Sequence, residues 1–451
     1  MSSNAAVSNP GLTMSAPEKS NIRWFVCFLL FLATTINYMD RSVFSLIEPL
    51  IHLPFMGWIP GVDAAHQVAF DNNYGNIWIA FQIAYGVGFL FAGRIIDKLG
   101  TKAGYAVAIL IWGCASLSHS LVGSVAGFCV ARVFLGLGES GNFPAAIKAT
   151  AEWFPTEERA LATGLFNSGS NASAYIAPAL IAFVTAKWSW RAGFICTGSM
   201  GLIWCVIWLL FPYNRLRRRP MLAQESPAAE PVAQAPTDKA LPYSVLLSNR
   251  GFWGFCIAKG LTDPVWWFYL FYLPKFLNDN YGLGIAQMTG PLAAVYTAAS
   301  VGSIGGGWLS GFLMKRGYTV NFGRKTAMLL TALCVVPIIA VPHMHTMFPG
   351  NAWPAIGLFC LATAAHQGWS ANIFTTPGDM FPSTSISTVV GIGGAFGAAG
   401  GAIFTWLVKR NLSLHPLFIF ALAGSAYVVG LLIFQLLVPK LGAARPRDQA
   451  A

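Results

Sequence analysis

Long apolar runs separated by short polar turns make up most of the chain. About twenty apolar residues cross a bilayer as a helix. On that measure the pattern predicts an all-α polytopic membrane protein with twelve spans. Their approximate limits are 22–50, 74–97, 102–121, 123–151, 159–186, 191–213, 250–279, 287–315, 324–343, 352–380, 385–408 and 416–438. The stretch 53–73 is long for a connection between two spans, and we assign it no role.

A polar segment between Tyr213 and Arg250 interrupts this series. It begins with four arginines within five residues and continues as a run rich in Ala, Pro, Glu and Gln. Such a composition cannot build a hydrophobic core and predicts a linker. We therefore expect a tail at 1–21, a six-helix bundle at 22–213, a linker at 214–249, a second six-helix bundle at 250–438 and a tail at 439–451.

Composition narrows the class further. The chain is 55% hydrophobic and only 10% charged, which excludes a soluble protein. Its net charge of +11 does not indicate nucleic-acid binding, because the cations lie in short turns between apolar spans. With the N-terminus in the cytoplasm, nineteen of the 28 Lys and Arg residues fall on the cytoplasmic side, which favours both termini inside. The eight cysteines lie in apolar spans without metal-ligand spacing, so we expect no metal and no cofactor.

Charged residues inside the apolar spans indicate a functional site. The stretch from Ala131 to Ala151 carries Arg132, Glu139 and Lys148, although each charge costs about 2.5–3.5 kcal/mol at mid-membrane. Arg132 and Glu139 are seven residues apart and therefore share one helix face. The alternative is an Arg that snorkels to the interface beside a structural Glu. A second charged pair in the first span, Asp40-Arg41, favours the functional interpretation.

A short turn after the second span has a counterpart in the other half. The first copy reads G-R-I-I-D-K-L-G-T-K and contains Gly93, Asp97, Gly100 and Lys102; the second reads G-F-L-M-K-R-G at 311–317. Repeated halves with a site between them are typical of transporters. The alternative is that any short cytoplasmic turn is basic.

These features together resemble the major facilitator superfamily, whose loop signature matches the turn at Gly93–Lys102. The second copy departs from this signature, because Lys315 stands near the position where the signature has an acid. The gating role of the signature therefore carries over less well to the second copy. Further motifs resemble the anion:cation symporter family. They are N-Y-M-D-R-S in span one, R-V-F-L-G-L-G-E-S in span four, and E-W-F-P-T-E-E-R-A with F-N-S-G-S leading into span five. W-W-F-Y-L-F-Y-L-P-K-F-L and A-H-Q-G-W-S-A-N-I-F-T-T-P-G-D-M-F-P are similar to the hexuronate branch.

The resemblance implies proton-coupled uptake of a small organic anion by alternating access across a bacterial inner membrane. It implies that Asp40 and Glu139 bind protons and that Arg41 and Arg132 take part in substrate binding. Aldonate-transporting relatives have a Gln where this chain has Ser170, so aldonate specificity is in doubt. Asn167 and Asn171 remain nearby as polar contacts.

The chemistry of a sugar acid suggests roles for these charges. The guanidinium group of Arg matches a carboxylate bidentately. Asp40 and Arg41 are adjacent, so they point about 100° apart on a helix and cannot face the same way. We expect Arg41 to take the substrate carboxylate and Arg132 to be the switching partner of Glu139. Protonation of Glu139 and Asp40 would then free an Arg for the substrate.

Sugar hydroxyls require small polar groups and aromatic faces. Candidates on five spans are Tyr38, Gln82, Tyr85, Asn167, Ser170, Trp266, Tyr269, His366, Gln367, Ser370 and Asn372. A Trp-rich membrane helix is more often a packing helix, and a helix–helix hydrogen bond explains His366 equally well. Asp263, before Pro264, marks either a proton path or a kink. We expect Lys148 and Lys259 to snorkel or to pair with cytoplasmic acids, and Asp379 to act in a gate or loop.

Two other function classes remain. An exporter of amphiphiles would share the fold, but the inward charges favour a compact anion. An enzyme would need a nucleophile–base pair or a metal set, and a receptor would need a soluble signalling domain; neither pattern occurs. The expected partners are a small organic anion, protons and the bilayer, and the protein is expected to be a monomer. Glucuronate, galacturonate, an aldonate, an aldarate and an aromatic carboxylate all remain possible substrates.

Overall fold

Helices make up almost all of the structure, a computed structural model that describes residues 18–47, 50, 64–216, 240–412 and 415–441. The predicted tails fall largely outside these ranges, and so do most of the predicted linker and the first part of the 53–73 connection. That connection is shorter than predicted, because the second helix begins ten residues early, at Ala64.

The N-terminal half contains the six predicted spans, the fourth of them in two pieces. Its helices are α1 (Glu18–Leu46), α2 (Ala64–Leu99), α3 (Thr101–Ser118), α4 (Val125–Glu139), α5 (Asn142–Trp153), α6 (Thr156–Lys187) and α7 (Trp190–Leu210). Gly100, with φ of 79°, allows the tight turn from α2 into α3 that a residue with a side chain rarely adopts. This turn belongs to the predicted loop signature.

The C-terminal half repeats the arrangement after the short helix α9 (Tyr243–Leu247). Its helices are α10 (Arg250–Tyr281), α11 (Ile285–Lys315), α12 (Val320–Val335), the 3-10 helix η3 (Val336–Ala340), α13 (Val341–Met347), α14 (Trp353–Ile373), α15 (Thr376–Met380), α16 (Ile386–Asn411) and α17 (Pro416–Leu437). The Asn249 side chain accepts hydrogen bonds from Gly251 N and Phe252 N and caps α10.

Proline explains the breaks that the apolar pattern did not predict in spans four and ten. Pro144 has no N–H, and its ring would clash with the carbonyl of Ser140 in a continuous helix, so the helix ends at Glu139. Pro377 has the same effect on Ile373, and α14 ends there. The freed carbonyl of Ile373 accepts a hydrogen bond from Thr376 Oγ1 at 2.8 Å.

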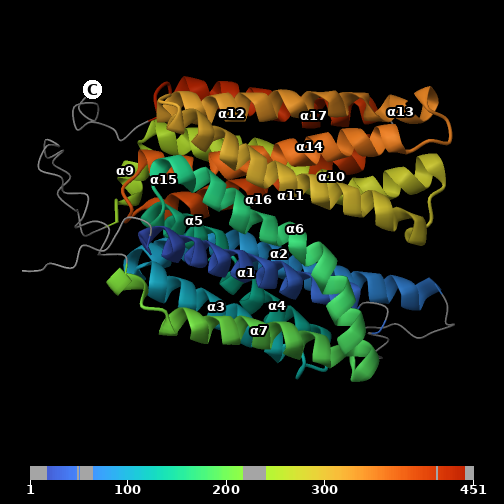
Figure 1. The fold of residues 1–451 in the computed structure, drawn as a ribbon. Helices are drawn as coiled ribbons and strands as arrows, with labels where there is room; N and C mark the ends of the chain where they lie inside the picture. Colours follow the sequence, from blue (N-terminus) through green and yellow to red (C-terminus); the bar gives the residue numbers. More distant parts are fainter. Residues whose placement is uncertain (1–17, 48–49, 51–63, 217–239, 413–414, 442–451) are drawn as a thin grey trace, which may run out of the picture.

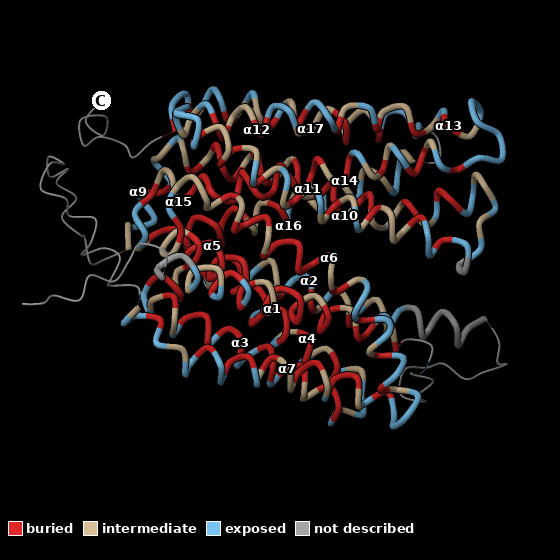
Figure 2. Tube along the Cα trace, in the orientation of Figure 1, coloured by how far each residue is buried: buried red, intermediate tan, exposed pale blue. Residues whose placement is uncertain are grey.

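The helices form two bundles that meet along α2–α16 and α6–α11 (Figure 1). One end of the molecule carries α9 and α15, and we call it the α9 end; the opposite end carries α13 and is called the α13 end. The bundles lie together at the α9 end and spread apart toward the α13 end (Figure 1). Buried residues concentrate where the bundles meet, while exposed ones line the outer surface (Figure 2).

Seven helices of the described part are long and apolar enough to cross a membrane by length and composition alone. They comprise α1, α2, α7, α11, the α12–α13 segment, α16 and α17. Their outer faces carry large apolar side chains, such as Phe91 at 58% and Leu436 at 76% exposure, which suits contact with lipid. The remaining spans carry most of the buried polar residues described next.

Candidate functional site

The break between α4 and α5 places a carboxylate in the interior of the N-terminal bundle. Glu139 is the last residue of α4, and its side chain is fully buried. Arg41 of α1 contacts it, with Nη2 at 2.9 Å and Nε at 3.2 Å from Oε2. The other carboxylate oxygen, Oε1, has no hydrogen-bond partner among the described residues. The break therefore creates a buried ion pair between two helices.

Aromatic rings enclose the Arg41 side chain. Its guanidinium carbon lies 4.5 Å from the ring centre of Tyr85, 4.9 Å from that of Tyr38 and 5.2 Å from that of Phe81. Ring faces attract cations, so these residues hold the guanidinium without neutralising it. The Arg41 side chain keeps 11% exposure, whereas Glu139 has none. The predicted residues Tyr38, Tyr85 and Arg41 therefore come together.

The predicted pairing of Glu139 with Arg132 is wrong for this structure, in which Arg41 is the partner. Arg132 lies two turns before Glu139, and helical side chains point toward the N-terminus, so Arg132 extends away from Glu139. Arg132 is fully buried, and none of its three side-chain nitrogens has a hydrogen-bond partner in the described part of the chain. Its guanidinium lies 4.5 Å from the Phe44 ring centre and 5.5 Å from that of Trp78.

Asp40 faces away from Arg41, as their adjacent positions predict. Its Oδ1 accepts a hydrogen bond from Ser116 Oγ of α3 at 2.7 Å. Ser116 Oγ also lies 3.4 Å from Thr197 Oγ1 of α7, and Asp40 Oδ2 has no partner among the described residues. Sequence reasoning missed both hydroxyl residues, because single Ser and Thr residues in apolar helices give no distinctive signal.

Two of the predicted polar residues join the two bundles. Asn167 Nδ2 of α6 donates to Gln367 Oε1 of α14 at 2.6 Å and lies 3.5 Å from Ser370 Oγ. Ser170, one turn further along α6, instead donates to the carbonyl of Asn167 at 2.7 Å within its own helix. Asn167 and Gln367 therefore form a polar contact across the interface between the bundles.

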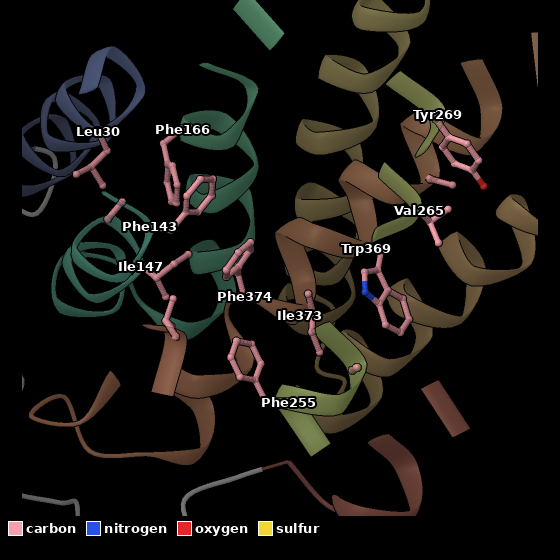
Figure 3. Packing of buried hydrophobic residues seen from close by; sticks show 14 of the residues in the cluster. Leu30, Phe143, Ile147, Phe166, Phe255, Val265, Tyr269, Trp369, Ile373 and Phe374 are labelled. Atoms are coloured by element: carbon pink, nitrogen blue, oxygen red, sulfur yellow. The ribbon is translucent and has the colours of Figure 1, made fainter. Parts of the chain in front are cut away.

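Several predicted hydroxyl contacts lie inside the C-terminal bundle. His366 Nδ1 lies 2.5 Å from Tyr427 Oη of α17, and its ring stacks on Trp266 at 5.0 Å between centres. This is the helix–helix hydrogen bond that we considered as the alternative for His366. Tyr269 packs edge-on against Phe359, on the far side of the bundle from Phe143 (Figure 3).

Asn372 and Gln82 were predicted to contact sugar hydroxyls, but the structure places them in different surroundings. Asn372 Nδ2 donates to the carbonyls of Gly306 and Gly368, at 2.8 and 2.9 Å, so it fastens α14 to α11. Gln82 is exposed on α2, one turn before Tyr85. The local sequence shows that such residues are polar, but it does not show which neighbours they bond to.

Asp97 of the predicted loop signature links the bundles at the α9 end. It accepts hydrogen bonds from Thr388 N at 2.7 Å, Thr388 Oγ1 at 2.6 Å and Ser387 N at 3.3 Å, at the start of α16. Lys148 Nζ lies 2.8 Å from Asp97 Oδ1, so Lys148 pairs with an acid as expected. A carboxylate at a helix N-terminus is favourable because free N–H groups point at it. Gly93 permits this approach, since a Cβ there would collide with the Ser387 carbonyl.

The second half uses different residues for an equivalent contact. Arg324 of α12 binds Asp379 Oδ2 at 3.0 Å and donates to the Thr156 carbonyl at 2.7 Å. Arg159 of α6 donates to the Gly378 carbonyl at 3.1 Å and lies 3.5 Å from Asp379 Oδ1. Asp379 therefore holds α15 against α6 and α12 through two arginines.

The described residues contain no group of three or more His, Cys, Asp or Glu side chains that could hold a metal ion. The site therefore consists of ionisable, amide and aromatic side chains. Most of these lie on α1, α2, α4, α6 and α14, and of these helices α2, α6 and α14 contact the opposite bundle. Such an arrangement can bind an anion and is typical of a membrane transporter.

Comparison with known proteins identifies the family. Residues 30–405 match the family model of the Major Facilitator Superfamily, and the chain belongs to this family. It is 30% identical to the hexuronate transporter of Escherichia coli K12 over 407 residues, which covers 88% of this chain and 90% of that protein. It is 28% identical to the galacturonate transporter of Dickeya chrysanthemi, covering 76% and 96%, and 28% identical to a probable galactarate/D-glucarate transporter of Bacillus subtilis, covering 85% and 88%.

Solved structures confirm the predicted fold class. The proton:xylose symporter XylE matches with a TM-score of 0.71 at 13% identity, covering 94% of this chain and 97% of that one. The fucose:proton symporter FucP matches with a TM-score of 0.64 at 15% identity, covering 93% and 99%. The chain therefore has the family's fold of twelve membrane helices in two pseudo-symmetric six-helix bundles.

Proposed function

We propose that this protein imports a sugar acid, a hexuronate such as glucuronate or galacturonate, by proton symport with alternating access. The observation that carries the proposal is the buried Arg41–Glu139 pair at 2.9 Å. A buried pair of this kind can exchange one anionic partner for another, because the Arg needs a counter-charge in a dry site. The sugar-acid transporters among its relatives support the choice of substrate.

Arg41 is the proposed carboxylate ligand. Its planar guanidinium offers two parallel N–H donors, which suit a carboxylate bidentately. Tyr38 and Tyr85 already hold this group in place, and its side chain is the more exposed member of the pair. The substrate carboxylate would replace that of Glu139 as the partner of Arg41.

Glu139 and Asp40 are the proposed proton sites. A proton on Glu139 removes its charge and with it the attraction for Arg41, which then has a vacant anion site. Asp40 has one oxygen bonded to Ser116 and one without a partner in the described chain, so it can take a proton without losing a bond. Loss of the protons on the other side of the membrane restores the Arg41–Glu139 pair and displaces the substrate.

The positions of Lys and Arg residues support an orientation in the membrane. We place the α9 end in the cytoplasm of a bacterial cell, as the distribution of Lys and Arg along the sequence favours, and the protein in its inner membrane as a monomer. The contacts of Asp97 and Asp379 then close the cytoplasmic side, and the molecule faces outward. The Asn167–Gln367 hydrogen bond must break when the bundles separate. The two side-chain amides are then free to bind sugar hydroxyls.

Other anions are alternatives for the same site. An aldonate, an aldarate or an aromatic carboxylate would also bind Arg41; the relative at 30% identity has hexuronate in its name, and the two at 28% have galacturonate and galactarate/D-glucarate. An exporter of amphiphiles would need an apolar cavity, and the buried Arg41, Glu139, Arg132 and Asp40 argue against one.

Uptake into proteoliposomes tests the proposal. Labelled glucuronate is supplied with an inward proton gradient, and unlabelled galacturonate, galactonate and benzoate serve as competitors. We expect accumulation that a protonophore abolishes and that galacturonate inhibits. Uptake of galactonate or benzoate in place of glucuronate would change the substrate, and the absence of any anion uptake would contradict the function.

A further inference from the structure

A second ion pair lies in the C-terminal bundle, on α10. Lys259 Nζ is 2.7 Å from Asp263 Oδ2, one helical turn away. The Lys259 side chain is only 3% exposed, and its ammonium group lies 3.6 Å from the ring centre of Phe374. Charges inside membrane helices are costly and usually mark a substrate or ion pathway.

The ring beneath Lys259 belongs to the interface between the bundles. Phe374 stacks on Phe143 of α5, with 5.2 Å between centres and 18° between planes. Figure 3 shows these two rings facing each other where the bundles meet. Phe143 follows Glu139 by four residues, just after the break that ends α4. Lys259 therefore lies on the C-terminal side of the same interface as the Arg41–Glu139 pair.

Asp263 is the more exposed member of this ion pair. Its side chain is 23% exposed, compared with 3% for Lys259. It rests against Gly397 of α16, where any Cβ would collide with the carboxylate. Asp263 is therefore the member of the pair that a ligand can reach.

A purely structural role explains the pair poorly. The same helix carries Lys275 and Asp279 at the same spacing, 2.6 Å apart, with 65% and 49% exposure. Such a pair adds little to helix stability even when it is exposed, and burial adds a desolvation cost. Pro264 does not require the pair either, because the Gly260 carbonyl that it frees packs closely against Gly400 of α16.

We propose that Lys259 and Asp263 bind the hydroxyl end of the sugar acid whose carboxylate Arg41 takes, and that Asp263 excludes a second carboxylate. This inference rests on the proposed function. The ammonium group of Lys only donates hydrogen bonds and the carboxylate of Asp only accepts them, so together they satisfy hydroxyls, which do both. A second substrate carboxylate would meet the like charge of Asp263. The site thereby selects sugar monoacids over aldarates.

Galacturonate and galactarate form a pair of probes that share a carbon skeleton: galacturonate is a ring-closed monoacid, and galactarate is the open-chain diacid that results when C1 is oxidised. Like charges brought together in a desolvated site cost enough for at least about ten-fold discrimination. We expect galactarate to inhibit labelled galacturonate uptake by the unaltered protein at least about ten-fold more weakly than galacturonate does. Asp263→Asn keeps the shape and leaves Lys259 free for a carboxylate, so the ratio should fall toward one.

Asp279→Asn is the control, since it removes the acid of the exposed pair on the same helix; its inhibition ratio should stay as in the unaltered protein. Binding in detergent, followed by the intrinsic tryptophan fluorescence of the protein, gives the same ratio without transport. If Asp263→Asn does not yield monodisperse protein, Asp263→Ser serves in its place.

Two results would overturn this inference and leave the proposed function standing. One is equal inhibition by galacturonate and galactarate in the unaltered protein. The other is a ratio that stays unchanged in Asp263→Asn while galacturonate is still transported. A protein that transports no sugar acid at all would instead overturn the proposed function.

Discussion

Arg41 Nη2 lies 2.9 Å from Glu139 Oε2, so the first helix of the chain is tied to the point at which the fourth span breaks. Both side chains lie well inside the protein, and neither can be removed without leaving the other charge unpaired. A proton on Glu139 weakens its ion pair with Arg41 while both side chains stay in place. The link between proton binding and the release of Arg41 is the centre of the proposed mechanism.

Glu139→Gln mimics the protonated carboxyl group permanently. Exchange of labelled for unlabelled substrate across the membrane should survive, because Arg41 stays free to bind it. Uphill uptake driven by a proton gradient should fail, because no proton is gained or lost at this position. Counterflow and gradient-driven uptake in the same proteoliposomes provide the measurement, and an equal loss of both activities would contradict the assignment.

Arg132 and Arg41 should respond oppositely in stability when each is replaced by Met. Arg132 has no hydrogen-bond partner in the described chain and lies against Phe44 and Trp78, so Met adds apolar contact and removes a desolvated charge. We expect Arg132→Met to stabilise the fold by about 1–4 kcal/mol. Arg41→Met leaves Glu139 buried without its partner and should destabilise by about 3–5 kcal/mol.

Thermal unfolding in one detergent at one pH compares the two variants. Transport should fall in Arg41→Met, because Arg41 is the proposed carboxylate ligand. A destabilised Arg132→Met would show that Arg132 has a counter-charge that the described contacts lack.

Ser116→Ala tests the second proton site. It removes the 2.7 Å hydrogen bond to Asp40 Oδ1 but leaves the carboxyl group in place. A hydrogen bond to a charged group contributes about 1.5–3 kcal/mol, so the proton affinity of Asp40 should rise. The pH dependence of uptake should then shift toward higher pH. Ser118→Ala is a suitable control, because Ser118 donates only to the Ala115 carbonyl of its own helix; a profile that does not move in Ser116→Ala would remove Asp40 from the coupling scheme.

Asp97→Asn should loosen the α9 end. Asp97 accepts three hydrogen bonds at the start of α16 and neutralises the buried Lys148, which would lose its partner. The hydrogen bonds to Ser387 and Thr388 join the two bundles, so weakening them acts on the state closed at this end, whereas the Asp97–Lys148 pair lies within the N-terminal bundle. Labelling of a cysteine introduced at Ala151 should therefore become faster. Asp279→Asn, on the exposed pair, should leave the labelling rate unchanged. An unaltered rate in Asp97→Asn would show that the Asp97 contacts do not hold the α9 end closed.

The apolar pattern was sufficient to predict the twelve spans, because a bilayer imposes one length and one polarity on each helix. It also placed Asp40, Arg41, Arg132 and Glu139 in the interior, since charges in apolar runs have few other positions. It did not predict the partner of Glu139, because that depends on how α1 packs against α4. A pair such as Asn167–Gln367 spans 200 residues and two bundles, and no local spacing reveals it. Lys259 and Asp263 did carry a signal in their i,i+4 spacing, but their burial against Phe374 comes only from the tertiary structure.

Proton movement driven by the substrate alone tests the central claim most directly. Proteoliposomes with equal pH on both sides, a pH-sensitive dye inside and potassium with valinomycin to clamp the voltage receive galacturonate from outside. The account predicts that the interior acidifies with the unaltered protein, and that Glu139→Gln still exchanges galacturonate but gives no acidification. Galacturonate entry without any pH change in the unaltered protein would contradict proton symport.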